Sequence, residues 1–246
     1  MAGHNKWSKI KHRKAVVDKR RGKVWTKVSK AIIVAAKNGG PDPATNLSLR
    51  YAIDEARYAN MPRDTIERAI QKGAFGSADE NYEPVRYEGY GPGGIAIIID
   101  TLTDNRARTV GDLRLAFDRN GGNLGNSGCV AYMFQPKGRM LVNAPGATEE
   151  RMMELAIEAG ADDCLMPDDP ADEPWTILCA VPSFQSVKEA IERLGKSQSI
   201  AITEAEIAMV PNELVEVTGT NADSLAELID AIEDLDDIQK VYTNAG

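Results

Sequence analysis

The sequence predicts an α+β protein of several domains, because two kinds of pattern occupy different parts of the chain. Before residue 73, apolar residues recur at helical spacing. After residue 86, short apolar runs typical of strands alternate with helical segments. The polar, turn-rich stretch 73–85 separates the two parts. We therefore expect an N-terminal three-helix bundle followed by two split βαβ (ferredoxin-like) α/β domains, one inserted in the other.

The predicted bundle has helices at 21–38, 44–60 and 62–72, preceded by an extended basic arm over 1–20. The first helix carries an apolar face and, within roughly 80° of arc on another face, a lysine stripe. The apolar face is Val24, Trp25, Val28, Ile32 and Ala35, and the lysine stripe is Lys23, Lys27, Lys30 and Lys37. The second helix is expected to turn Leu47 inward. The glycines at 39–40 are expected to end the first helix, and Gly73 the third.

The α/β part is expected to contain strands at 95–101, 129–134, 138–143, 162–166, 175–181, 199–209, 213–218 and 238–243, with helices at 105–120, 148–159, 183–194 and 222–234. Residues 136–210 alone follow the order βαββαβ, and the flanking segments supply two further βαβ units. The predicted domains are 1–80 (basic arm and helical bundle), 81–135 plus 211–246, and the inserted 136–210. An insertion is tolerated where the two ends of the inserted unit lie close together. The alternative is three domains in simple sequential order.

Charge is distributed very unevenly along this chain. The whole protein carries a formal charge of -8, yet residues 1–40 hold twelve Lys or Arg and a single acid, Asp18. That segment is therefore +11, and the remaining residues are -19. A basic arm on an acidic body attracts polyanions, of which nucleic acid is the commonest in the cytoplasm. The alternative is a solvated, solubilising tail.

The basic segment also carries flat side chains. Lys and Arg neutralise phosphates, while Trp7 and His12 offer faces for unstacked bases. The expected nucleic-acid-binding residues are Lys6, Trp7, Lys9, Lys11, His12, Arg13, Lys14, Arg20, Arg21, Lys23, Lys27 and Lys30. An equally weighted alternative makes Trp7 an anchor that packs on the bundle. Trp25 is assigned to the bundle core, because it lies on the apolar face.

Other sites are disfavoured by spacing. The three cysteines form no C-x-x-C pair, which fits a reducing compartment, and His4 and His12 lack partners for a metal. The glycine-rich run 89–94 precedes a strand, so it is read as a tight turn and not as a phosphate loop. The acidic pairs and the run 233–237 are read as solvated surfaces. We expect no catalytic residue, no cofactor and no small-molecule substrate. Neither a membrane span nor a secretory signal is evident.

Several blocks of the sequence resemble the YebC family of bacterial and organellar regulators. They are MAGHNKWSKIKHRKAVVDKRRGKVWTKV at the start, AAKNGGPDP at 35–43, NMPRDTIERAI at 60–70, YEGYGPGG at 87–94, DNRARTVGDLRLAF at 104–117, GGNLG at 121–125 and VAYMF at 130–134. The match runs from residue 1 to about 140, and beyond it only the element order agrees. The resemblance implies a helical bundle, two α/β domains and no known catalysis.

Family members are described either as DNA-binding transcriptional regulators or as translation factors that act at the ribosome, including a mitochondrial translational activator. The sequence shows no helix-turn-helix signature, and a lysine-rich arm with stacking side chains suits structured RNA at least as well as duplex DNA. We therefore expect a bacterial, cytoplasmic, nucleic-acid-binding regulator of gene expression, a transcriptional regulator by the family's usual label, with a ribosome-associated translation factor as the alternative. The rival classes are an enzyme using the acidic loops and a protein-interaction scaffold.

Overall fold

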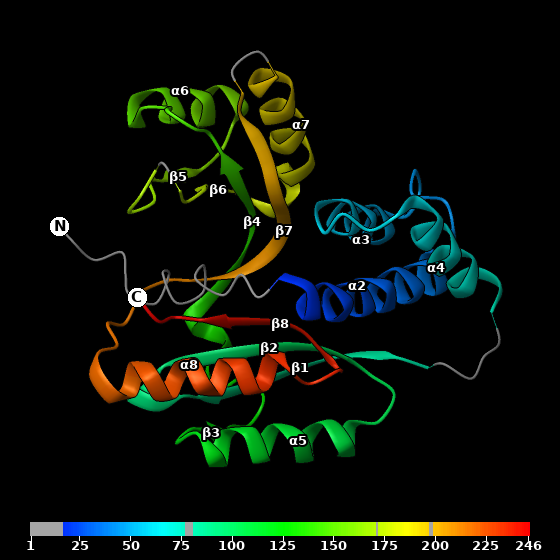
Figure 1. Cartoon of the computed structure of the whole chain (residues 1–246), viewed down its shortest axis with the longest axis vertical. Helices are drawn as coiled ribbons and strands as arrows, with labels where there is room; N and C mark the ends of the chain where they lie inside the picture. The colour runs from blue at the N-terminus through cyan, green and yellow to red at the C-terminus, as the bar shows by residue number, and fades with distance from the viewer. Residues whose placement is uncertain (1–16, 77–80, 171, 197–198) are drawn as a thin grey trace. The chain divides into compact units, whose positions relative to one another are not determined.

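The computed structural model describes residues 17–76, 81–170, 172–196 and 199–246, with side chains described from Gly22 onward. These residues form two compact units. One is Gln135–Val210, and the other joins the described residues up to Phe134 with Pro211–Gly246. The predicted α+β class, with N-terminal helices ahead of two four-stranded sheets, is confirmed (Figure 1). The finer division into three domains stays a prediction.

The N-terminal bundle consists of α2 (Val17–Gly39), α3 (Leu47–Tyr58) and α4 (Arg63–Phe75). Helices α3 and α4 both pack on α2. Their shared core is Val28, Ile32, Ala35, Ala36, Leu49, Ala52, Ile53, Ala56, Met61, Ile66 and Ala69. Val24 and Leu47 were expected inward but are exposed. Helix α2 also begins at Val17, inside the stretch predicted as an extended arm. The rest of that arm lies outside the described residues.

Asn46 joins the end of α2 to the start of α3. Its Oδ1 accepts the backbone N–H of Leu49 at 3.0 Å, which caps the N-terminus of α3. Its Nδ2 donates to the carbonyl oxygens of Ala35 and Gly40, both at 2.8 Å. Gly40 has φ +86°, a left-handed conformation that lets the chain leave α2. The predicted end of this helix at the glycine pair is confirmed.

Gly73 does not end α4, contrary to the prediction. The helix continues to Phe75, and Gly73 lies within it where α4 crosses α2. A Cβ atom added at Gly73 would lie 2.4 Å from the carbonyl oxygen of Ile33 and 2.9 Å from the Cβ of Ala36. Two helix backbones approach closely here, and only glycine leaves room.

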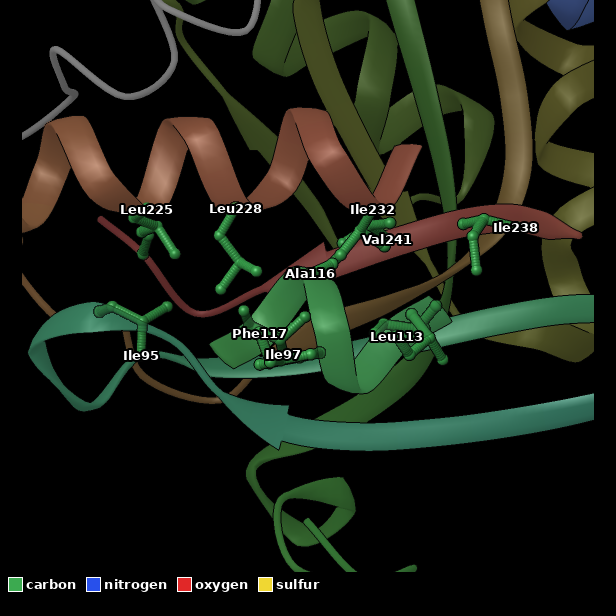
Figure 2. Close-up of a cluster of buried hydrophobic side chains, with 12 residues drawn as sticks. Ile95, Ile97, Leu113, Ala116, Phe117, Leu225, Leu228, Ile232, Ile238 and Val241 are labelled. Carbon is green, nitrogen blue, oxygen red and sulfur yellow. The ribbon is translucent and has the colours of Figure 1, made fainter. Parts of the chain in front are cut away.

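The larger unit also contains a four-stranded antiparallel sheet in the order β3-β1-β2-β8. Its strands are β1 (Glu83–Tyr90), β2 (Ala96–Thr103), β3 (Asn123–Leu124) and β8 (Ile238–Thr243), and its helices are α5 (Arg106–Arg119) and α8 (Gly219–Glu233). Side chains from α5 and α8 meet those of β2 and β8 in one core (Figure 2). Phe117, Leu113, Leu225 and Leu228 are fully buried in it. The two helices therefore cover the same face of the sheet.

Three predicted details of this sheet are wrong. Strand β1 was not predicted, since its sequence is polar and only part of it is buried. Residues 129–134 contain a short 3-10 helix, Ala131–Met133, instead of a strand. Residues 213–218 form only an isolated bridge, from Val215 to Ala245. Short apolar runs do not separate strands from buried turns, which explains the last two errors.

The unit Gln135–Val210 contains a sheet in the order β5-β6-β4-β7. Its elements are β4 (Phe134–Asn143), α6 (Glu149–Ala159), β5 (Asp163–Leu165), β6 (Trp175–Cys179), α7 (Phe184–Gly195) and β7 (Ala201–Pro211). This order of elements and strands is the predicted split βαβ arrangement. Its buried side chains include Met140, Met152, Trp175, Ile177 and Phe184.

Candidate nucleic-acid interface

Helix α2 is the described part of the predicted nucleic-acid interface. Its apolar face packs into the bundle through Val28 and Ile32, and its lysines lie on another side of the helix. Trp25 is partly buried against the same core, and its Nε1 donates to the carbonyl of Ala59 at 3.0 Å. This places Trp25 as predicted, in the bundle. The lysine stripe is therefore carried by a helix that is packed into the bundle core.

Most of the predicted contact residues lie outside the described part of the chain. This group comprises Lys6, Trp7, Lys9, Lys11, His12, Arg13 and Lys14. Arg20 and Arg21 belong to the first turns of α2, of which only the backbone is described. The predicted roles of all nine residues stay predictions.

The first three lysines of the lysine stripe contact the segment 233–237, which we call the acidic segment. Lys23 Nζ lies 3.0 Å from Asp234 Oδ1. Lys27 Nζ donates to the carbonyl oxygen of Glu233 at 2.7 Å, and Lys30 Nζ donates to that of Asp236 at 2.9 Å. Helix α8 ends at Glu233, so Lys23 and Lys27 lie at its C-terminal end, where helix carbonyls lack partners and the helix dipole is negative. Lys30 binds the turn that follows the helix, at Asp236.

The fourth member of the stripe, Lys37, donates to Asn81 Oδ1 at 2.7 Å. Lys30 also lies 5.0 Å above the ring of Tyr82, close enough for a cation–π interaction. On α3, Glu55 Oε1 is 2.5 Å from Lys240 Nζ of β8. Charged side chains thus hold the bundle to the sheet at several points within this unit.

Asp237 is the buried end of the acidic segment. Its Oδ1 lies 3.4 Å from Lys30 Nζ, and its Oδ2 accepts from Arg108 Nη2 at 2.7 Å and from Thr109 Oγ1 at 2.9 Å. Burial alone raises the pKa of Asp237, but the hydrogen bonds from Arg108 and Thr109 and the charges of Arg108 and Lys30 outweigh burial, so the pKa is lowered. The carboxylate is therefore ionised.

Sequence reasoning missed this network, because it treated the acidic segment as solvated. Asp237 is 6% exposed, which corrects that reading for this residue. Buried carboxylates need cationic or hydrogen-bonding partners, and these come from α2 and α5, far away in sequence. The DNRAR motif at 104–108 was the available signal, since its second arginine is Arg108.

Burial lowers the pKa of Lys27, and the neighbouring Lys23 lowers it further, whereas the charges of Glu233 and Asp234 raise it. Burial has the largest effect, so the net pKa lies below the ordinary lysine value. This ammonium group thus lies between the surface and the interior, unlike the solvated lysine that helical spacing alone suggests.

The glycine-rich run 89–94 forms a tight turn, as predicted. Residues Pro92–Gly94 make a 3-10 turn between β1 and β2, and the Gly91 N–H bonds the Ile95 carbonyl at 2.7 Å. Beside it, the buried carboxylate of Glu88 accepts the backbone N–H groups of Gly128, Val130 and Ala131, each at 2.8 Å. Glu88 is thus a structural anchor for the loop that follows β3.

Among the residues that the structure describes, no cluster of His, Cys, Asp and Glu is suited to a metal ion. The three cysteines are free thiols. Burial raises the pKa of Cys164 and of Cys179 to about 11, so both are protonated at neutral pH. Within the same described ranges, no helix is both long and apolar enough to cross a bilayer.

Comparison with known families decides the identity of this arrangement. Residues 5–76 match the TACO1/YebC protein N-terminal domain, and residues 82–245 match the TACO1/YebC second and third domain. The chain belongs to the TACO1/YebC family. In family terms, the bundle with its lysine stripe is the N-terminal domain, and the acidic segment belongs to the second and third domain.

Relatives within the TACO1/YebC family extend over the whole chain. A probable transcriptional regulatory protein of Burkholderia multivorans is 51% identical over 245 residues, covering 100% of this chain and 98% of its own length. One of the same description from Polynucleobacter asymbioticus is 49% identical, covering 100% and 99%. The crystal structure of a conserved hypothetical protein from Aquifex aeolicus superimposes with a TM-score of 0.86 at 43% identity, covering 98% of this chain and 97% of that one.

Proposed function

We propose that this protein is a non-enzymatic, cytoplasmic regulator of gene expression that binds nucleic acid through its basic N-terminal segment. The observation that carries the proposal is the +11 charge of residues 1–40 on a chain whose remainder is -19. Phosphates attract such a segment, and the acidic remainder repels them, so contact is confined to one region. Helix α2, Val17–Gly39, is the folded part of this segment that the structure describes.

Transcriptional regulation is the first candidate, because relatives about 50% identical over their full length are called probable transcriptional regulatory proteins. Translational regulation at the ribosome is the second candidate. It is favoured by Trp7 and His12, whose flat faces suit the unpaired bases of structured RNA. Both candidates use the same phosphate contacts. They differ in whether the nucleic acid offers unpaired bases on which side chains can stack.

The first prediction is that binding depends strongly on salt. If the arm neutralises about six phosphates, affinity falls roughly a thousandfold between 50 and 200 mM salt, for duplex DNA and for a stem-loop RNA of mixed sequence. Replacing Lys9, Lys11, Arg13 and Lys14 with Ala is expected to reduce the slope of log K against log salt by roughly 3 to 4. Fluorescence anisotropy on labelled probes measures both quantities.

A matched control removes the same charge elsewhere. Arg114, Arg119, Arg193 and Lys196 are exposed residues outside the basic segment, and their replacement with Ala is expected to leave the slope unchanged. A flat salt response of the unaltered protein, or an equal loss of slope in the control, would contradict the proposal.

Trp7→Ala separates the two candidates. A loss of about 1–3 kcal/mol for the stem-loop RNA alone favours the translational one.

A further inference from the structure

The acidic segment and the lysine stripe already pair with one another. The segment supplies four carboxylates, from Glu233, Asp234, Asp236 and Asp237. Lys23, Lys27 and Lys30 of α2 bond to it, and Arg108 of α5 pairs with Asp237. Asp236 lines one cavity with Lys23 and Lys27, and a second cavity of about 530 Å³ with Lys30. The lysines on this side of α2 are therefore already paired with groups of the acidic segment.

We propose that the acidic segment is an internal competitor for nucleic acid, which excludes phosphates from Lys27 and Lys30 and so sets the boundary of the binding surface on α2. This inference rests on the proposed function, because it concerns the same basic segment. The bound nucleic acid then contacts the arm and the first turns of α2. Lys23 lies at the boundary.

Burial along the contact supports this boundary. At the outer end, the side chains of Lys23 and Asp234 are 43% and 76% exposed. At the inner end, those of Lys30 and Asp237 are 14% and 8% exposed. Exposed ion pairs contribute little and exchange readily, whereas a buried pair is costly to break. The pairing is therefore weakest at the outer end, at Lys23, and strongest at the inner end, at Lys30.

The acidic segment competes with phosphates in two ways, through its backbone carbonyl oxygens and through its carboxylates. Lys27 and Lys30 donate to the backbone carbonyl oxygens of Glu233 and Asp236, and these two bonds do not depend on the charge of the carboxylates. The carboxylates around them add repulsion to any phosphate that comes within about 10 Å at 0.1 M salt. Removing the exposed carboxylates is thus expected to lift the repulsion while the lysine–carbonyl bonds and the buried Asp237 network keep the fold.

The test neutralises the exposed part of the acidic segment in the full chain. The variant Glu233→Gln, Asp234→Asn, Asp236→Asn is compared with the unaltered protein by fluorescence anisotropy on the same duplex DNA and stem-loop RNA. We expect about tenfold tighter binding at 50 mM salt. We also expect a slope of log K against log salt steeper by about two, because phosphates gain Lys23 and Lys27.

A matched control separates local competition from net charge. Glu158→Gln, Asp168→Asn, Asp172→Asn removes three exposed carboxylates from the unit Gln135–Val210 and leaves the acidic segment intact. It is expected to leave the slope unchanged. Adding Lys23→Ala and Lys27→Ala to the neutralised variant should abolish its gain in affinity and its steeper slope.

Acetylation footprinting provides a second readout, which does not depend on the stability of the variant. Stem-loop RNA is expected to leave the acetylation of Lys27 unchanged in the unaltered protein and to protect it in the neutralised variant. Equal protection in both proteins, equal gains in the neutralised variant and its control, or no gain in affinity would overturn the inference. The absence of any binding by the unaltered protein and by the variant would instead remove the proposed function itself.

Discussion

At the scale of single residues, two buried carboxylates organise the larger unit. Glu88 accepts three backbone N–H groups, whereas Asp237 is bound by cationic and hydroxyl side chains. Burial by itself raises the pKa of Glu88, but the three N–H donors and the charge of Arg86 together outweigh burial and lower it. A carboxylate with a lowered pKa stabilises the fold above its unfolded pKa, and this stabilisation is lost as pH falls through the folded pKa.

Glu88→Gln is expected to destabilise the protein by about 1–3 kcal/mol at pH 7, because an amide NH₂ would then face backbone donors. The variant should also lose less stability than the unaltered protein as pH falls below about 4. Urea unfolding at several pH values measures both effects. Glu227→Gln, at an exposed site on α8, is the control. Equal stability of the two variants at neutral pH would show that the Glu88 carboxylate is dispensable.

At the scale of elements, the crossing of α4 over α2 depends on Gly73, although glycine has a low helix propensity. Glycine in a helix interior costs about 1 kcal/mol relative to alanine. The gain from replacing it at position 73 is outweighed by the collision of a new Cβ with the Ile33 carbonyl, 2.4 Å away. A Gly→Ala substitution is therefore expected to destabilise the protein where two helices cross and to stabilise it on an exposed helix surface.

Gly73→Ala is expected to lower the free energy of unfolding by about 1–3 kcal/mol, the usual cost of overpacking. Gly111 of α5 provides the comparison, because it is exposed and a Cβ added there would meet no atom within 4 Å. Gly111→Ala should therefore stabilise the protein by up to about 1 kcal/mol. Thermal unfolding of both variants tests the difference. A stabilising Gly73→Ala would mean that the two helices do not cross so closely.

At the scale of the whole molecule, the chain enters and leaves the unit Gln135–Val210 at neighbouring positions. Strands β4 and β7 are adjacent in its sheet, and just outside it the Asn212 N–H bonds the Met133 carbonyl at 2.8 Å. The unit also has a core of its own, which includes Met140, Ile177 and Phe184. These are the conditions under which an inserted unit folds independently.

Residues 135–210 expressed alone are expected to unfold cooperatively, with a single sigmoidal transition in urea that circular dichroism and Trp175 fluorescence report at the same midpoint. The full chain is the reference. A gradual transition, or two midpoints that disagree, would show that the unit needs the rest of the protein for its packing.

The sequence by itself was enough to determine the fold class, most helices and the split βαβ order of 136–210, because apolar periodicity over long segments is a local property. Strand β8 was placed at 238–243, where the structure has it. The +11 segment was likewise visible, since charge can be counted without coordinates. Short or polar elements were not predicted correctly. Strand β1 was missed, and residues 129–134 were predicted to be a strand.

Only the tertiary structure decided what the charged residues contact. Helical spacing places Lys23, Lys27 and Lys30 on one face but does not reveal that the end of α8, some two hundred residues later, covers it. The same holds for Gly73, which local rules treat as a stop, and for Asp237, which they treat as solvated. In each case the deciding partner is distant in sequence, so burial and close approach arise only when the chain folds.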